Sequence, residues 1–145
     1  DANNLPHPPF IFRMNSYISG TLNAIGYING NKVAETVQST PGPPAKIQLM
    51  IDESGRSLKT GCNDIVFIYA SVTDLKGTLI PTDNRLMRFT IEGDAELIGS
   101  NPISAEAGIA TILLKAGRET GVIKVTAFAE GLEPVVFSLT FKDNK

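Results

Sequence analysis

Ile65-Val66-Phe67-Ile68-Tyr69-Ala70-Ser71-Val72-Thr73 is the most apolar stretch of the sequence, and it decides the fold class. Side chains of a β-strand point alternately to its two faces. Val66, Ile68, Ala70 and Val72 therefore share one face, which can be wholly buried. β-branched and aromatic residues of this kind are enriched in strands. The stretch predicts a buried strand within a β-sheet.

Shorter stretches with strand character lie on both sides of this segment, separated by clusters of Gly, Pro, Asn and Asp. The expected strands are Ala45–Ile51, Ile65–Thr73, Met87–Ile91, Ala95–Ile98, Ile109–Lys115, Val122–Ala129 and Val135–Phe141. About seven strands at this spacing are typical of an immunoglobulin-like β-sandwich. No stretch keeps the apolar 3.6-residue pattern of a stable helix. We therefore predict an all-β fold.

The residues before this region predict a smaller group of strands. Phe10–Met14 has the pattern of a short strand, and Gly20–Ile28 and Lys32–Ser39 flank the dipeptide Asn29-Gly30. Asn-Gly between two strand-like stretches is a strong hairpin signal, because both residues tolerate positive φ. About three strands are too few for an independent sandwich. We interpret residues 1–42 as the C-terminal part of a preceding, truncated β-sandwich domain.

The segment Pro41-Gly42-Pro43-Pro44 is the clearest boundary in the sequence, because Pro and Gly interrupt strands. Residues 43–145 then form a complete immunoglobulin-like (invasin-like) β-sandwich domain. A truncated sandwich in residues 1–42 would leave a sheet edge unpaired. Such an edge invites pairing with a second copy of the chain, so self-association is an expectation of this reading.

Charge and composition argue against several classes of function. The chain has 13 Lys and Arg against 15 Asp and Glu, and its basic residues form no cluster suited to nucleic-acid phosphates. No apolar run approaches the about 20 residues of a membrane-spanning helix. Asp1-Ala2-Asn3-Asn4 lacks the basic and apolar regions of a signal peptide, so any export signal would lie outside this sequence. We expect neither nucleic-acid binding nor membrane insertion.

The residue types that catalysis and metal binding require are sparse. His7, the single histidine, lies between prolines in an extended segment. We expect an exposed linker residue there, not a member of a Ser-His-Asp triad or a metal ligand. Cys62 is the single cysteine, so no intramolecular disulfide can form, and we expect a small, partly buried thiol.

Carboxylates invite comparison with glycosidases, which use two of them for acid–base and nucleophilic work. The candidates are Asp52, Glu53, Asp64, Asp74, Asp83, Glu92, Asp94, Glu96, Glu106, Glu119, Glu130 and Glu133. Nearly all fall at expected turns or strand ends, where solvated carboxylates are common. Asp83 with Asn84, or Asp94 with Glu96, could touch calcium, but their spacing matches no dense calcium-binding loop. We therefore predict no catalytic, cofactor-binding or metal-binding residue.

Carbohydrate binding is a separate alternative. Sugar-binding surfaces rely on exposed aromatic rings, and the sequence contains no Trp. The candidates are Tyr17, Tyr27 and Tyr69, of which Tyr69 lies in the most apolar predicted strand. An independent carbohydrate-binding module would depend on these tyrosines.

Several segments resemble a known family. Glu92–Pro102 and Ala105–Leu114 contain a Gly-x-Asn-Pro segment followed by Glu-x-Gly and an apolar strand, and residues 127–132 read Ala-x-Ala-x-Gly-Leu. They resemble the C-terminal immunoglobulin-like domain of bacterial family 2 glycoside hydrolases of the β-galactosidase type. Gly20–Ala24 and Thr40–Ile47 resemble the end of the preceding β-sandwich in the same enzymes.

This resemblance implies a C-terminal piece of a secreted or periplasmic enzyme that cleaves terminal β-linked sugars by the retaining mechanism. In that family the catalytic glutamates lie on an upstream TIM barrel, so no catalytic residue carries over to this chain. The piece would act by packing against neighbouring domains of the same polypeptide. The second domain also resembles repeats of bacterial invasin-type surface proteins, so a structural or adhesive module is the alternative.

Overall fold

The computed structural model describes residues 4, 6, 9–53, 55, 59, 61 and 64–141. The chain forms two compact units, Asp1–Thr40 and Pro41–Lys145. The division falls at the start of the Pro-rich segment, and each unit is described by itself. The regular elements of the described residues are strands, which confirms the predicted all-β fold class. No helix in this part of the chain is long and apolar enough to cross a membrane.

The first unit contains an antiparallel hairpin of β1 (Thr21–Ile28) and β2 (Asn31–Ser39). The turn residues Asn29 and Gly30 have φ angles of 52° and 78°, so the predicted Asn-Gly turn is confirmed. No described residue of this unit is buried. The hairpin therefore contributes no apolar core of its own.

Phe10–Met14 was expected to be a strand, and this prediction is wrong. The segment has no strand geometry and does not pair with β1 or β2, and Phe10 is 92% exposed. Its apolar and aromatic residues favour a strand, but a strand also needs a neighbour to accept its backbone hydrogen bonds.

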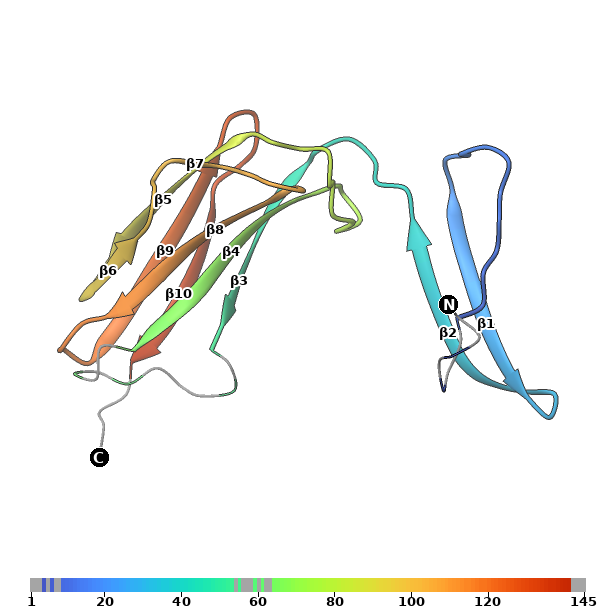
Figure 1. Cartoon of the computed structure of the whole chain (residues 1–145). Coiled ribbons are helices and arrows are strands. Elements are labelled where there is room, and N and C mark those ends of the chain that lie inside the picture. Colours follow the sequence, from blue (N-terminus) through green and yellow to red (C-terminus); the bar gives the residue numbers. More distant parts are fainter. Residues whose placement is uncertain are drawn as a thin grey trace. The chain divides into compact units, whose positions relative to one another are not determined.

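The second unit consists of two antiparallel sheets (Figure 1). The β4 sheet has the order β3-β4-β8-β6, and the β9 sheet has the order β10-β9-β5-β7. The strand bounds are β3 Lys46–Asp52, β4 Ile65–Thr73, β5 Leu86–Glu92, β6 Ala95–Ile98, β7 Ile103–Ser104, β8 Ile109–Ala116, β9 Gly121–Ala129 and β10 Val135–Phe141. The predicted β-sandwich is confirmed.

The core lies between the two sheets and is built by alternation along each strand. Val66, Ile68, Ala70 and Val72 of β4 are buried, as the pattern of this stretch predicts. The largest fully buried side chains are Phe89, Ile68, Met87, Leu114, Ile123, Val72 and Val125. Burying each of these side chains contributes about 1.5–3 kcal/mol. The core is therefore the main source of stability in this unit.

The short strand β7 was not predicted, because two residues are too few to show a pattern. It pairs with β5 through Leu86 with Ser104 and Met87 with Ile103. Further along β5, the Asn101 side chain takes over the pairing. Its Oδ1 accepts the Phe89 N–H at 2.9 Å, and its Nδ2 donates to the Phe89 carbonyl at 2.7 Å. The carboxamide thereby extends the edge of the β9 sheet.

Candidate functional site

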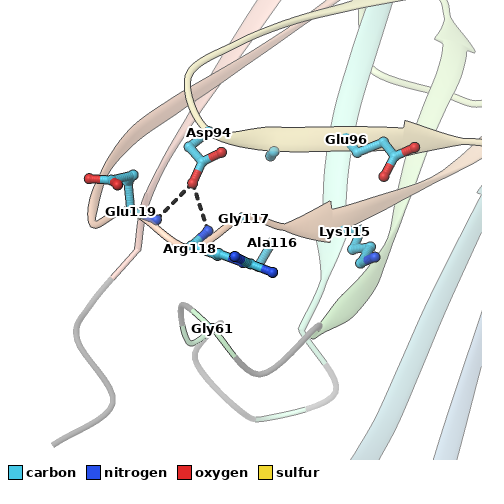
Figure 2. A pocket seen from close by; sticks show the side chains of 9 residues that line it. Gly61, Asp94, Glu96, Lys115, Ala116, Gly117, Arg118 and Glu119 are labelled. Atoms are coloured by element: carbon cyan, nitrogen blue, oxygen red, sulfur yellow. Dashed lines mark hydrogen bonds between the residues drawn. The ribbon is translucent and has the colours of Figure 1, made fainter.

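A polar hollow on the second unit lies beside the turn that joins β8 to β9 (Figure 2). Its volume is about 520 Å³. The lining comes from the start of β6, the end of β8, the turn itself and one residue of the β3–β4 loop: Gly61, Asp94, Ala95, Glu96, Lys115, Ala116, Gly117, Arg118 and Glu119. The hollow therefore contains acidic and basic side chains together.

Asp94 is the best-connected side chain of this hollow. Its Oδ2 accepts the backbone N–H of Arg118 at 2.6 Å and that of Glu119 at 2.7 Å, as Figure 2 shows. These backbone donors, that of Glu119 first, lower the pKa of the Asp94 carboxyl. The Asp94 backbone carbonyl also accepts the N–H of Gly117 at 3.0 Å. Asp94 therefore holds the β8–β9 turn in place.

Gly117 explains why the turn approaches Asp94 so closely. A Cβ atom at Gly117 would lie 2.3 Å from the carboxyl carbon of Asp94, which is closer than real contacts allow. The glycine is required by space, and the hollow beside it follows from this tight loop packing. These contacts give Asp94 a structural role.

Asp74 performs the same task at the turn after β4. Its Oδ1 accepts the N–H groups of Lys76 at 2.8 Å and Thr78 at 2.9 Å, and its Oδ2 accepts the N–H of Gly42 at 2.8 Å. The donors from Gly42 and Thr78 lower the pKa of this carboxyl most. Asp74 is only 5% exposed. It ties the Pro-rich segment to the sandwich.

Asp83, which with Asn84 formed one of the two suggested calcium-contacting pairs, forms an ion pair with Arg85. Its carboxylate lies 2.8 Å from the guanidinium of Arg85 and is 7% exposed. The hydrogen bond from Arg85 lowers the pKa of Asp83 and raises that of Arg85. Arg85 also donates to the Glu130 carbonyl at 2.7 Å, which links two loops. Within the described residues, no cluster of three or more His, Cys, Asp or Glu could hold a metal ion.

The remaining carboxylate candidates lie at strand ends, in turns or on short loops. Asp52 and Glu92 end strands, and Glu96 lies on the outer side of β6; the others are Glu53, Asp64, Glu106, Glu119, Glu130 and Glu133. A glycosidase acid needs a raised pKa so that it stays protonated. The carboxyls with a resolved shift among the described residues are Glu35, Asp74, Asp83 and Asp94, and every one of these shifts is downward. These four carboxyls are tuned to remain ionised.

The three tyrosine candidates fall in both units of the chain. Tyr17 and Tyr27 belong to the first unit and are 78% and 61% exposed. The Tyr17 hydroxyl lies 3.1 Å from the Thr40 Oγ1. Tyr69 belongs to β4 in the second unit, is half-buried on its outer face, and stacks on Phe67 with ring centroids 6.0 Å apart. His7 and Cys62 lie outside the described residues, so the interpretations of both stay predictions.

Sequence reasoning missed the residues that matter most to the loops. Asp74 was named only as a turn carboxylate and Asp94 as a turn carboxylate that could touch calcium, and Arg85 and Asn101 were not singled out as contacts. Each of the four side chains has a partner that lies 12 to 45 residues away in the chain. The one local signal was the Asn-Pro order at Asn101 and Pro102, which marks an irregular segment after β6.

The fold and these loops define a class of protein. It is a two-sheet, immunoglobulin-like domain in which carboxylates with a lowered pKa hold the loops by hydrogen bonds. Within that class, residues 47–138 match the family model described as glycoside hydrolase family 2 C-terminal domain 5, and the chain belongs to this family. The predicted resemblance is confirmed.

Curated proteins of similar sequence agree with this family assignment. The chain is 34% identical over 136 residues to a β-galactosidase of Thermoanaerobacter pseudethanolicus, covering 88% of this chain and 18% of that protein. It is 31% identical over 137 residues to β-galactosidase BoGH2A of Bacteroides ovatus, covering 86% of this chain and 16% of that protein. The chain thus spans less than a fifth of the length of either relative.

Solved structures show the same fold. A β-glucuronidase from glycoside hydrolase family 2 superimposes with a TM-score of 0.78 at 23% identity, covering 94% of this chain and 15% of that one. At this identity the likeness supports the fold alone.

Proposed function

We propose that this chain is a non-catalytic accessory region of a larger family 2 glycoside hydrolase. The parent enzyme would cleave β-galactosides or related β-linked sugars by the retaining mechanism. This region would act by packing against neighbouring domains and supporting the catalytic barrel. The observation that carries the proposal is the match to two β-galactosidases over less than a fifth of their length.

The chemistry of the described residues agrees with a supporting role. Retention requires two carboxyl groups about 5–5.5 Å apart, one of them protonated in the resting enzyme. The shifted carboxyls Asp74, Asp83 and Asp94 accept hydrogen bonds from this chain, and the pKa of each is lowered. Their oxygens stabilise loops of this domain, and this favours a structural role over a catalytic one.

The test compares the 145-residue chain with the full-length gene product on an aryl β-galactoside. We expect turnover by the full-length protein and no turnover by the chain alone. Hydrolysis by the purified chain would contradict the accessory role. A full-length product inactive on aryl β-galactosides and β-glucuronides alike would contradict the proposed parent activity.

A secreted or periplasmic location of the parent is part of the same proposal. Fractionation of the producing cells tests it directly. Recovery of the full-length protein in the cytoplasmic fraction would contradict it.

A further inference from the structure

The two sheets of the second unit present very different outer faces to solvent. On the β9 sheet, three exposed apolar residues have polar partners in register, and Leu86 lies with Phe128 and Pro102 along a shallow hollow beside Arg88 and Thr90. Phe128 pairs with Arg88, Val136 with Thr126, and Val122 with Thr140. Scattered or small groups of apolar residues of this kind are normal on protein surfaces, and none of them forms a continuous row across the strands of this sheet.

On the β4 sheet, the outward apolar residues are contiguous. Phe67 of β4 pairs with Leu113 of β8, which pairs with Ile98 of β6. Tyr69 of β4 pairs with Met50 of β3 and stacks on Phe67 with an interplanar angle of 11°. We call Met50, Phe67, Tyr69, Ile98 and Leu113 the outer apolar patch.

The outer apolar patch crosses all four strands of its sheet. Met50 is 58% exposed and Phe67 47% exposed, while Tyr69, Ile98 and Leu113 are half-buried. None of the five belongs to the core cluster, which occupies the opposite face of the same strands. The core therefore does not explain them. Contiguous apolar patches of this kind mark interaction surfaces.

The size of the sheet face that carries the patch limits the kind of partner. Four strands about 4.8 Å apart, averaging seven residues at about 3.3 Å each, give a whole face of about 440 Å², so an interface on it counts at most about 900 Å² on both partners. Interfaces between domains of one chain bury about 600–1,500 Å². Stable interfaces between separate proteins need about 1,200–2,000 Å². A tethered partner needs less area because the linkage raises its effective concentration.

We propose that the outer apolar patch docks onto an apolar surface of a neighbouring domain of the same polypeptide. This inference rests on the proposed function, in which the chain spans less than a fifth of its parent. The patch assigns the packing role to one face, the outer side of the β4 sheet. The outer side of the β9 sheet stays in solvent.

Hydroxyl-radical footprinting of the full-length protein and of the 145-residue chain tests this assignment. Met50, Phe67 and Tyr69 should be oxidised at least about fivefold more slowly in the full-length protein, because interface cores exclude solvent. Val122, Phe128 and Val136 should be oxidised at equal rates in both. Equal rates for Met50, Phe67 and Tyr69, or protection of Phe128 instead, would overturn the proposal.

Two other occupants give distinct results. A second copy would protect the patch in the isolated chain, with protection rising with concentration and a dimer seen in sedimentation. A sugar would protect Phe67 and Tyr69 of the isolated chain when β-linked galacto-oligosaccharides are added. Either result would overturn docking of a neighbouring domain.

A matched pair of variants separates docking from folding. Phe67→Ser in the full-length protein should expose Met50 and Tyr69 to oxidation, whereas Phe128→Ser on the other sheet should not. Circular dichroism of both variants in the 145-residue chain checks that the sandwich is intact. Unchanged protection in a folded Phe67→Ser protein would contradict the proposal. A full-length protein that hydrolyses β-galactosides with an unprotected patch would keep the proposed function and overturn this inference alone.

Discussion

Three short polar side chains organise the loops of the second unit. Asp74, Asp94 and Asn101 each bond backbone groups that lie far away in the sequence. A backbone N–H or carbonyl that loses its partner in a folded protein costs free energy. These side chains therefore supply hydrogen bonds at places where the strands cannot, and substitutions there affect stability.

Asn101→Ala should lower the free energy of unfolding by about 1–2 kcal/mol. The substitution removes both hydrogen bonds to the backbone of Phe89, each of which contributes about 0.5–1.5 kcal/mol. Urea denaturation of the 145-residue chain measures the change. Asn84→Ala, at an exposed position in the loop before β5, is the matched control and should change stability much less. Equal effects of the two substitutions would contradict the role given to Asn101.

The free energy of unfolding should fall in acid, because the stabilising contribution of the Asp74 carboxylate is lost when it is protonated. Its pKa is lowered in the folded state by the N–H groups of Gly42 and Thr78. Its contribution to stability is therefore present above the unfolded pKa of about 4 and is lost as the pH falls through the lower folded pKa.

We expect Asp74→Asn to flatten the fall in unfolding free energy between about pH 5 and pH 2. Urea denaturation at a series of pH values measures it. Asp94→Asn should act in the same direction, because the pKa of Asp94 is also lowered by backbone donors. Wild-type pH dependence in both variants would contradict this account.

At the scale of single elements, the two units differ in what holds their strands. The strands β4 and β8 bury one whole face, whereas β1 and β2 bury none of their residues. An isolated two-stranded hairpin is marginally stable in water. The cross-strand contact of Thr21 Oγ1 with Ser39 Oγ at 3.0 Å and the ion pair of Lys32 with Glu35 within β2 add little, because they are exposed.

Amide hydrogen exchange should separate the hairpin from the sandwich. In the 145-residue chain we expect the amides of β1 and β2 to exchange many times faster than those of β4 and β8, because protection follows local stability. Mass spectrometry of peptic peptides measures it. Similar protection in both would contradict this expectation and would favour the predicted self-association through an unpaired hairpin edge.

Strands whose apolar residues alternate were predicted from the sequence, and features that depend on distant parts of the chain were not. Ile65–Thr73 was predicted because every second residue enters the core. Phe10–Met14 has a similar local pattern, but a strand also depends on a neighbour that the pattern does not reveal. The support given by Asp94 could not be predicted, because its donors at Arg118 and Glu119 come from a distant turn. The outer apolar patch depends on register between four strands.

At the scale of the whole molecule, the core belongs to one unit. Its buried residues run from Ile47 to Leu139, and none comes from the part of the first unit that the structure describes. Glycoside hydrolase family 2 membership was recognisable from the order of loop motifs. Stability of the second unit should therefore not depend on residues 1–40.

Removing residues 1–40 should leave the thermal unfolding of residues 41–145 nearly unchanged. The described residues among those deleted contribute no buried apolar side chain, and the midpoint should shift by about 2 °C or less. Differential scanning calorimetry of both proteins measures it. A drop of about 10 °C or more would contradict the expectation and would mean that the first unit stabilises the second.

The Asn101 side chain that bonds to Phe89 is followed by Pro102, and this order has a consequence for chemical ageing. Asparagine deamidates when the backbone nitrogen of the next residue attacks the side-chain carbonyl, and proline has no N–H with which to do so. Pro102 therefore protects the carboxamide that completes the β5 edge. Asn29 is followed by a glycine, which offers no steric obstacle. As the protein ages, its hairpin turn should gain negative charge while the edge of the sandwich keeps its amide.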